Sequence, residues 1–175
     1  MDVQARTWTR AELVEALRAS RDYVVATVRA LSPERLEEGR YENGWNGRQI
    51  LAHIASIEWT YPRLIDIARE AQAPGAAPSA VAEPPTRAMR GGNDAYNERQ
   101  VAKRAHLSAA ELLAEFERNR AETIRAVETA DEALFACPIR SAGGVTGPLA
   151  AVFHQVAVEH VLGHARDLRG ARPGS

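Results

Sequence analysis

Apolar residues recur at intervals of three and four along four long segments of the chain, which is the spacing of an amphipathic helix. β-Branched residues form no alternating runs, so the pattern predicts an all-α protein whose four long helices form a bundle. The first two stripes are Leu13, Leu17, Val24, Val28 and Leu31, then Ile50, Ile54, Ile57, Leu64 and Ala68. The last two are Leu112, Phe116, Asn119, Thr123 and Val127, then Leu149, Val152, Phe153, Val156, His160 and His164.

Residues with known preferences for helix ends mark where these segments begin and stop. Thr9 is a candidate N-cap of the first helix, and residues 32–47 are expected to form a turn region before the second. Ser108 is followed three residues later by Glu111, the pattern of a capping box at the start of the third helix. Pro148 suits the first turn of the last helix.

Proline and glycine interrupt the helical pattern at two places. Residues 72–92 contain repeated proline and glycine, so we expect a long connection that crosses over between helices 2 and 3. Residues 93–105 are expected to form a short helix, and residues 137–144 a loop before the last helix. Neither side of the long connection carries enough amphipathic helix to close a core alone. We therefore expect one domain over residues 1–175.

Charge and composition exclude several classes of protein. The 22 Lys and Arg nearly balance the 23 Asp and Glu, with no basic stripe, so we expect no nucleic-acid partner. No apolar stretch is long enough to span a membrane, and the first residues are polar, so we expect a cytoplasmic protein with neither a signal peptide nor a membrane partner. Cys137 is the single cysteine, so an internal disulfide is excluded. We expect Cys137 to act as a small hydrophobic residue.

The histidines are the residues with the most informative positions. His160 and His164 are four residues apart, so a helix places them about 40° apart on one face, one turn from each other. His53 lies one turn from Ile50 and Ile57, near the inner face of the second helix. Three imidazoles from two helices would leave one coordination position of a metal ion open. These three residues are the predicted metal ligands.

Other interpretations of the histidines stay open at this point. An inward-facing histidine is more often a hydrogen-bonded core residue than a ligand, and two histidines at this spacing occur by chance. The spacing of His160 and His164 matches the helix of zinc peptidases, but the glutamate of that motif is missing, which excludes a peptidase of that type. His154 is expected to pack or face outward, and His106 to lie in a solvated turn.

Three stretches together resemble the DinB/YfiT-like family, whose superfamily includes the N-terminal domain of mycothiol-dependent maleylpyruvate isomerase. They are WNGRQILAHIASIEW, NDAYNERQVAKRAHLSAAELLAEFERNRAETIRAV and VFHQVAVEHVLGHARDLRG, and the resemblance extends from about Trp8 to Gly170. It implies a four-helix bundle with a long crossover between helices 2 and 3. It also implies one divalent ion, zinc or nickel, held at the positions of His53, His160 and His164. In the isomerase branch the residue matching His160 is glutamate, which argues against isomerase activity here.

The resemblance favours a metal-dependent enzyme acting on a small-molecule substrate with a low-molecular-weight thiol such as mycothiol, bacillithiol or glutathione. An S-transferase is the first hypothesis, because a thiol that coordinates a divalent metal is deprotonated. A metal-dependent hydrolase and a non-catalytic binding or stress-response module are the alternatives. The resemblance also implies a homodimer as one assembly of such bundles. No catalytic residue is assigned from the sequence.

For the residues around the histidines, we first expect packing or surface roles. Asp167 lies three residues after His164 and is able to orient its ring, although a surface ion pair with Arg166 is the commoner case. Trp59, which follows Glu58 on the helix of His53, is expected in the core rather than as a pocket wall. Arg48, Arg63 and Arg166 are candidates for binding a cofactor carboxylate, and surface positions are expected for all of them.

Overall fold

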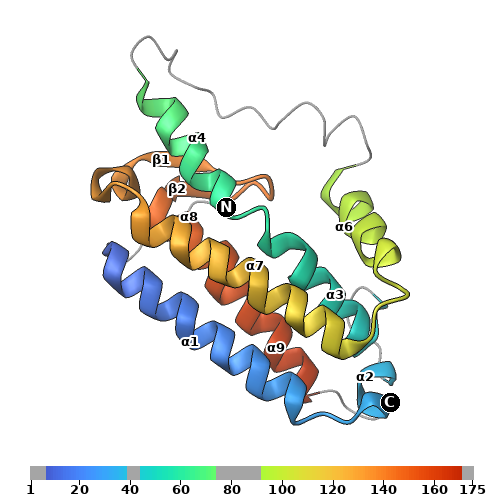
Figure 1. Cartoon of the computed structure of the whole chain (residues 1–175). Coiled ribbons are helices and arrows are strands. Elements are labelled where there is room, and N and C mark those ends of the chain that lie inside the picture. Colours follow the sequence, from blue (N-terminus) through green and yellow to red (C-terminus); the bar gives the residue numbers. More distant parts are fainter. Residues whose placement is uncertain (1–6, 39–43, 74–91, 171–175) are drawn as a thin grey trace.

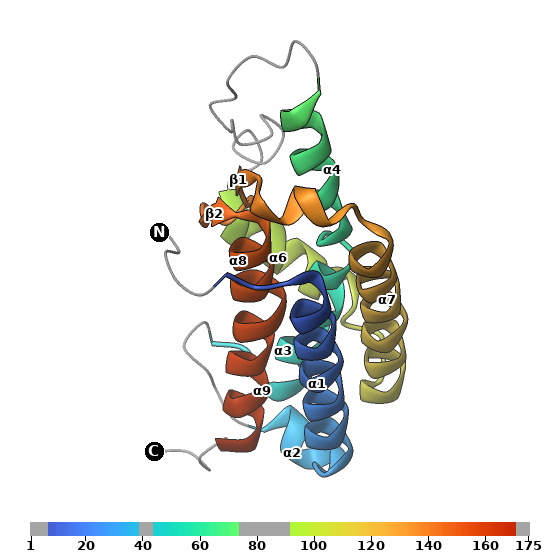
Figure 2. The same ribbon diagram turned by 90° about the vertical axis from the view of Figure 1, so that its left-hand side faces the viewer.

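Helices α1, α3, α7 and α9 lie side by side in the computed structural model, which describes residues 7–38, 44–73 and 92–170 (Figures 1 and 2). α1 (Arg10–Arg29) begins where the sequence predicts, at Thr9. The Thr9 hydroxyl accepts from the N–H of Glu12, and the Glu12 carboxylate accepts from the N–H of Thr9, which completes a capping box. Leu13, Leu17, Val24 and Val28 are buried as one stripe, and Leu31 lies beyond the end of the helix.

The predicted turn region after α1 contains one short helix, α2 (Pro33–Glu37), capped by Ser32. α3 (Gly47–Glu58) then begins at Asn46 with a second capping box, which Gln49 completes. A side chain on Gly47 would meet the backbone oxygen of Leu36 at 3.1 Å, so glycine allows α2 to approach the start of α3 closely. This close approach explains the glycine that follows Trp45 and Asn46.

The second predicted helix is broken in two, which corrects the continuous helix expected through Leu64 and Ala68. α3 ends at Glu58, and α4 (Pro62–Gln72) begins after three intervening residues. Pro62 has no N–H to continue the helix and its ring clashes with the preceding turn, so the chain bends at residues 59–61. Tyr61 is the residue before the proline and is buried at this bend.

The expected long connection, residues 72–92, begins at the end of α4, and its residues 74–91 lie outside the described part of the chain. α6 (Gly92–Lys103) follows as the predicted short helix and packs on the outside of α3. α7 (Ala109–Thr129) begins with the predicted capping box of Ser108 and Glu111. It packs against both α1 and α3, which in turn pack against α9, so the four helices close one bundle.

The expected loop between α7 and the last helix has regular structure. A short 3-10 helix, η1 (Glu132–Ala136), leads into an antiparallel hairpin of β1 (Pro138–Arg140) and β2 (Thr146–Pro148). Ile139 of this hairpin is buried, and the turn includes Gly144 with a φ of 81°, a conformation that favours glycine. The glycine pair therefore marks a hairpin turn within the expected loop.

The last helix runs from Leu149 to Gly170 but is not α-helical throughout. α8 (Leu149–His154) and α9 (His160–Gly170) are joined by one π turn, η2 (Gln155–Glu159). The turn contains one residue more than an α-helix would, so the buried stripe moves by one position. Beyond Phe153 the fully buried positions are Ala157, Val161, Ala165 and Leu168. The predicted stripe through Val156, His160 and His164 is therefore displaced, and both histidines lie at its flank.

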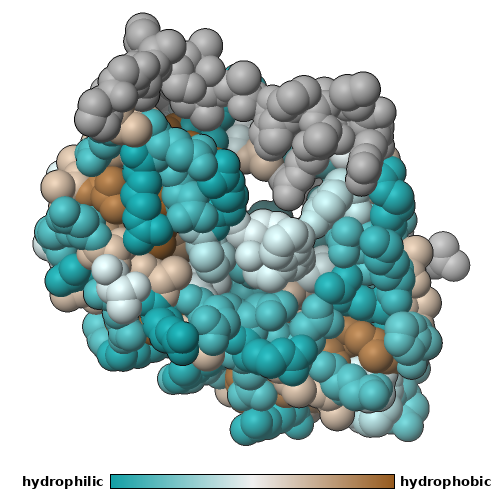
Figure 3. Space-filling view, turned by 45° about the horizontal axis from the view of Figure 1, so that its top comes forward, coloured by the Kyte–Doolittle hydropathy of each residue, from teal (hydrophilic) through white to brown (hydrophobic). Residues whose placement is uncertain are grey.

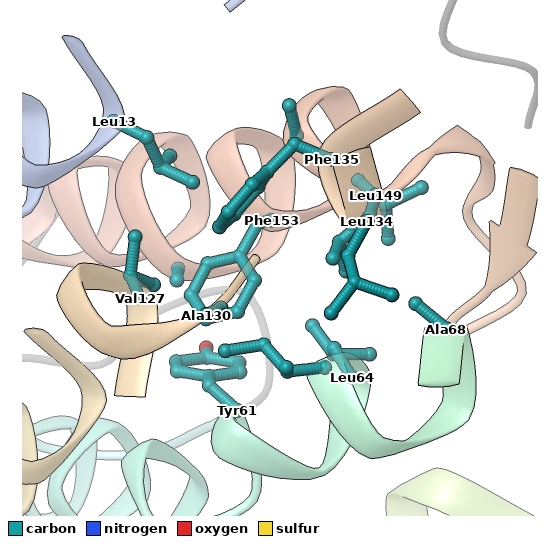
Figure 4. Close-up of a cluster of buried hydrophobic side chains, with 14 of the residues drawn as sticks. Leu13, Tyr61, Leu64, Ala68, Val127, Ala130, Leu134, Phe135, Leu149 and Phe153 are labelled. Atoms are coloured by element: carbon teal, nitrogen blue, oxygen red, sulfur yellow. The ribbon is translucent and has the colours of Figure 1, made fainter. Parts of the chain in front are cut away.

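The apolar side chains form two clusters along the bundle. One lies at the hairpin end and brings Tyr61, Leu134, Phe135 and Phe153 together (Figure 4). The other lies toward α2 and contains Trp45, Phe116 and Leu168. Burying a leucine or phenylalanine contributes about 1.5–3 kcal/mol, so these clusters account for the cohesion of the four helices. The architecture is the predicted four-helix bundle.

Polar residues cover most of the face in Figure 3, with hydrophobic patches that are small and separate. Among the described residues, no helix combines the length and the apolar character needed to cross a membrane.

Candidate metal centre

Three histidines from two helices meet inside the bundle. His53 lies in the second turn of α3, His160 is the first residue of α9, and His164 follows one turn later. The Nε2 atoms of His53 and His160 are 3.3 Å apart, and one ring nitrogen from each histidine lies within 4.8 Å of the other two. The rings meet edge to face, with centroid separations of 4.6–5.5 Å. The structure therefore brings together the three residues that the sequence singled out.

The three imidazoles differ in their access to solvent. His53 is 3 % exposed and packs against the indole of Trp45, with ring centroids 5.1 Å apart. The Trp45 indole is held in turn by a 3.0 Å hydrogen bond from Nε1 to the carboxylate of Glu98 on α6. His164 is half-buried and His160 is exposed. His53 is thus the most buried member of the cluster and His160 the most exposed.

All three histidines favour the neutral form. Burial lowers the pKa of His53 to about 3, with further lowering by the neighbouring His164 and His160. Although His160 as a residue is exposed, the protein around its ring and the charge of His164 lower its pKa to about 4. Burial also lowers the pKa of His164. Neutral imidazole is the form that coordinates metal ions, so the nitrogens are ready to coordinate at neutral pH.

The chemistry of the donor set and one of its separations match a divalent ion such as zinc. Two imidazole nitrogens bound tetrahedrally at the usual zinc–nitrogen distance are about 3.3 Å apart, which is the separation of the His53 and His160 Nε2 atoms. Within the described residues, the buried Nδ1 atoms of His53 and His164 have no hydrogen-bond partner.

Asp167 and Arg166 occupy the surface beside the cluster. The Asp167 carboxylate lies 3.8 Å from His164 Nδ1, which is too long for a hydrogen bond, and its side chain is 55 % exposed. Arg166 is exposed on the same helix. The structure thus places Asp167 next to the ring without a hydrogen bond that would fix it.

The other two histidines lie outside the cluster, as expected. His154 stacks on the indole of Trp8, with ring centroids 3.9 Å apart, and its Nε2 lies 3.8 Å from the carboxylate of Glu159. His106 is exposed in the turn between α6 and α7. Cys137 is buried at the end of η1, in agreement with its expected apolar role.

The candidates for substrate and cofactor contacts are mostly surface residues. Trp59 is 58 % exposed at the bend between α3 and α4, so the prediction that it lies in the core was wrong. The chain bends there because Pro62 cannot continue the helix of α3. Arg48 pairs with Glu37 and donates to the backbone oxygen of Ala105. Arg63 pairs with Glu70 on the surface of α4.

The sequence did not lead us to expect one buried polar cluster, formed by Glu58 and Arg120. Glu58 of α3 and Arg120 of α7 are both fully buried and form a two-pronged ion pair, with 2.8 Å from Nε to Oε1 and 2.8 Å from Nη2 to Oε2. Arg120 also donates to the backbone oxygens of Leu17 and Ala157 and to the hydroxyl of Ser20. Burial raises the pKa of Glu58, and the Arg120 guanidinium counteracts this. The available signal was an arginine between Phe116 and Thr123, on the apolar side of a helix.

Comparisons with known proteins found one matching family and several solved structures with a similar fold. Residues 17–169 match the family described as "Mycothiol maleylpyruvate isomerase N-terminal domain". No curated protein matches the sequence. A crystal structure of the mycothiol-dependent maleylpyruvate isomerase superposes with a TM-score of 0.68 at 19 % identity, covering 94 % of this chain and 62 % of that one. The chain therefore spans less than two thirds of the isomerase.

Two further solved structures share the fold over nearly their whole length. YfiT from Bacillus subtilis, titled "a probable metal-dependent hydrolase with an unusual four-helix bundle topology", gives a TM-score of 0.60 at 14 % identity, covering 95 % of this chain and 91 % of that one. The colibactin self-resistance protein ClbS, solved in complex with a dsDNA, gives 0.60 at 10 % identity, covering 97 % of this chain and 99 % of that one. At these identities the similarity concerns the fold.

Proposed function

Because the chain belongs to the mycothiol maleylpyruvate isomerase N-terminal domain family, within the DinB/YfiT-like proteins, we propose that His53, His160 and His164 bind one divalent metal ion. We further propose that the metal-bound protein transfers a low-molecular-weight thiol to a small electrophile. The observation that carries the proposal is the convergence of three neutral imidazoles with one exposed side.

The residues of the chain have distinct roles in this proposal. His53 anchors the ion at the closed side, where Trp45 excludes water from its ring. His160 holds it at the open side, where an incoming ligand has access. A divalent ion at this position lowers the pKa of a thiol or water that coordinates it, which is the chemistry of both a transferase and a hydrolase. The proposal assigns no nucleophile to the protein, in keeping with the buried position of Cys137.

The comparisons support a thiol and a small substrate, and they also keep a hydrolase as the second candidate. The isomerase that shares the fold is named as mycothiol-dependent. YfiT is described as "a probable metal-dependent hydrolase", and this chain covers 91 % of its length against 62 % of the isomerase. The more complete overlap with YfiT is the observation that favours hydrolysis by a metal-bound water.

A nucleic-acid substrate is less well supported, although ClbS was solved with dsDNA. The chain has 22 basic and 23 acidic residues, so it offers no excess positive charge to neutralise phosphates. Several described arginines that face the surface are already paired with carboxylates, among them Arg18, Arg48 and Arg63. We propose a small-molecule substrate, and a binding titration with duplex DNA at low salt tests this by its expected lack of saturation.

The decisive assay compares the two chemistries on one preparation. Protein loaded with zinc or nickel is given mycothiol, bacillithiol or glutathione with a panel of electrophiles, and the loss of free thiol is measured. The same protein without thiol is given ester and amide substrates. Transferase activity predicts metal-dependent thiol consumption that is lost in His160→Ala and kept in His106→Ala, which replaces an exposed histidine outside the cluster.

Each other outcome has a definite meaning. Hydrolysis without thiol consumption would replace the transferase by the hydrolase. A protein that holds its ion but consumes neither class of substrate would be a binding module, and the transferase proposal would be wrong.

A further inference from the structure

The π turn lies immediately before the histidine pair of α9. The N–H of His160 donates to the backbone oxygen of Gln155, five residues back, instead of to the residue four back. Where a helix changes from α-type to π-type hydrogen bonding and back, one backbone carbonyl is left without a donor from its own helix. That carbonyl needs a donor from elsewhere. A donor from another part of the protein therefore stabilises η2.

Tyr61 supplies the first donor. Its hydroxyl donates to the backbone oxygen of Val156 at 2.6 Å, and its ring packs at 6.3 Å from that of Phe153 within the hairpin-end cluster (Figure 4). Pro62 causes the bend that turns Tyr61 inward, so the break between α3 and α4 has a structural consequence for the last helix. Burial raises the pKa of the Tyr61 hydroxyl, which keeps it protonated as a donor.

Arg120 supplies the second donor. Its Nη2 donates to the backbone oxygen of Ala157 at 2.8 Å while contacting the Glu58 carboxylate at the same distance. Ala157 lies three residues before His160, and Glu58 lies five residues after His53. One guanidinium thus joins the helix of His53 to the helix of the other two histidines, close to where the rings meet.

We propose that Tyr61 and Arg120 are positioning residues that hold η2, and thereby place the histidines of α9 against the histidine of α3. Neither residue contributes a nitrogen to the histidine cluster, so both act through the backbone of the last helix. The part of this inference that concerns metal affinity rests on the proposed metal site; the part that concerns η2 stands without it.

Tyr61→Phe is the sharpest test, because it removes one oxygen atom and keeps the buried ring. Two controls remove a hydroxyl elsewhere. Tyr23→Phe removes one that accepts from Arg169 at the surface, and Thr123→Val removes a buried one that contacts the backbone oxygens of Glu58 and Asn119. Amide hydrogen exchange is measured on all three in the metal-free state. Zinc affinity is measured by competition with a chromophoric chelator, and ligand geometry by the absorption spectrum of the cobalt-substituted protein.

The expected result is specific to Tyr61→Phe. Exchange of the amides in residues 155–164 rises about fivefold, the effect of losing one buried hydrogen bond. Zinc affinity falls about tenfold, as on removing a group that orients metal ligands, and the cobalt spectrum changes. Both control variants keep the wild-type spectrum and affinity, even if Thr123→Val lowers overall stability.

The outcomes separate this inference from the proposed function. Unchanged exchange in residues 155–164 of Tyr61→Phe overturns the positioning role, whether or not metal binds. A wild-type protein that binds no zinc or cobalt contradicts the metal site alone, and the exchange result still decides the role of Tyr61. Equal losses of affinity in Tyr61→Phe and Thr123→Val would show a general effect of stability and also overturn the inference.

Discussion

Two polar clusters include residues of α3, His53 in one and Glu58 in the other, and they differ in charge and in exposure. The Glu58–Arg120 pair joins opposite charges, both side chains are fully buried, and the guanidinium also reaches three further groups of the protein. The histidine cluster joins three like groups that remain neutral, and one of them is exposed.

The difference teaches how to distinguish a structural polar cluster from a binding one. A buried polar group is tolerated when its partners are built into the protein, which holds for the ion pair. The histidine cluster brings together nitrogens of three neutral imidazoles with no opposite charge among them, which is an arrangement that a cation completes. The comparison predicts that the ion pair determines stability and that the histidines determine binding.

The largest expected effect comes from breaking the ion pair. Arg120→Met leaves the Glu58 carboxylate buried without its partner, which lowers the free energy of unfolding by about 3–5 kcal/mol. Chemical denaturation of the metal-free protein measures this. The double variant Glu58→Gln/Arg120→Met removes both charges and is expected to recover a large part of the loss. A single variant as stable as the wild type would show that the pair has no structural role.

The second effect concerns the response to metal. Zinc at about 100 times its dissociation constant stabilises the native state by about 2.7 kcal/mol, because an ion that binds only the folded chain shifts the equilibrium towards it. His160→Ala is expected to abolish this stabilisation while leaving the metal-free protein within about 0.5 kcal/mol of the wild type, since the residue is exposed. Thermal melts with and without zinc measure both quantities. His106→Ala serves as the control, and an unchanged zinc response in His160→Ala would contradict the account.

The third effect is a dependence of stability on pH. The pKa of His53 is lowered from 6.5 to about 3, so the unfolded chain binds a proton at this residue that the folded chain excludes. Its contribution to stability is therefore complete above pH 6.5 and is lost as the pH falls towards 3. Below pH 6.5 the loss is about 1.4 kcal/mol per pH unit.

Denaturation of the metal-free protein at pH 7 and 5.5 measures this loss. His53→Gln does not titrate in this range and is expected to show a smaller difference between the two pH values than the wild type. Equal pH dependence in both proteins would mean that the imidazole of His53 is not held in its neutral form.

The smallest effect is expected for Asp167, beside the histidine cluster. Its carboxylate is exposed and 3.8 Å from His164 Nδ1, so Asp167→Asn should change the free energy of unfolding by less than about 0.5 kcal/mol. Zinc affinity should fall only a few-fold. A loss of tenfold or more in a zinc titration would instead identify Asp167 as the group that orients the ring in the metal-bound protein.

The sequence was sufficient for the parts of the fold that depend on local patterns. The capping boxes of Thr9 and Ser108 and the apolar stripes of α1 and α7 appear where predicted, because their determinants lie within a few residues of one another. The convergence of His53 with the other two histidines was also anticipated. Metal binding by these residues stays a prediction, as do the single domain over residues 1–175, the cytoplasmic location and the homodimer.

The features that were missed depend on contacts between distant segments. The π turn of η2 changes the register of the last helix, and its donors come from Tyr61 and Arg120, which lie 95 and 37 residues away from the carbonyls they contact. The partner of Arg120 on α3 is 62 residues away. Periodicity within one helix contains no information about such partners. The hairpin of β1 and β2 was missed because three-residue strands are too short to show alternation.

The central claim is that the histidine cluster holds one ion. Elemental analysis tests it on wild-type protein prepared without chelator, offered zinc or nickel and then freed of unbound metal, next to a variant with alanine at His53, His160 and His164. The account predicts close to one ion per chain in the wild type and none in the variant. An empty wild type, or an equal metal content in the two proteins, would contradict it.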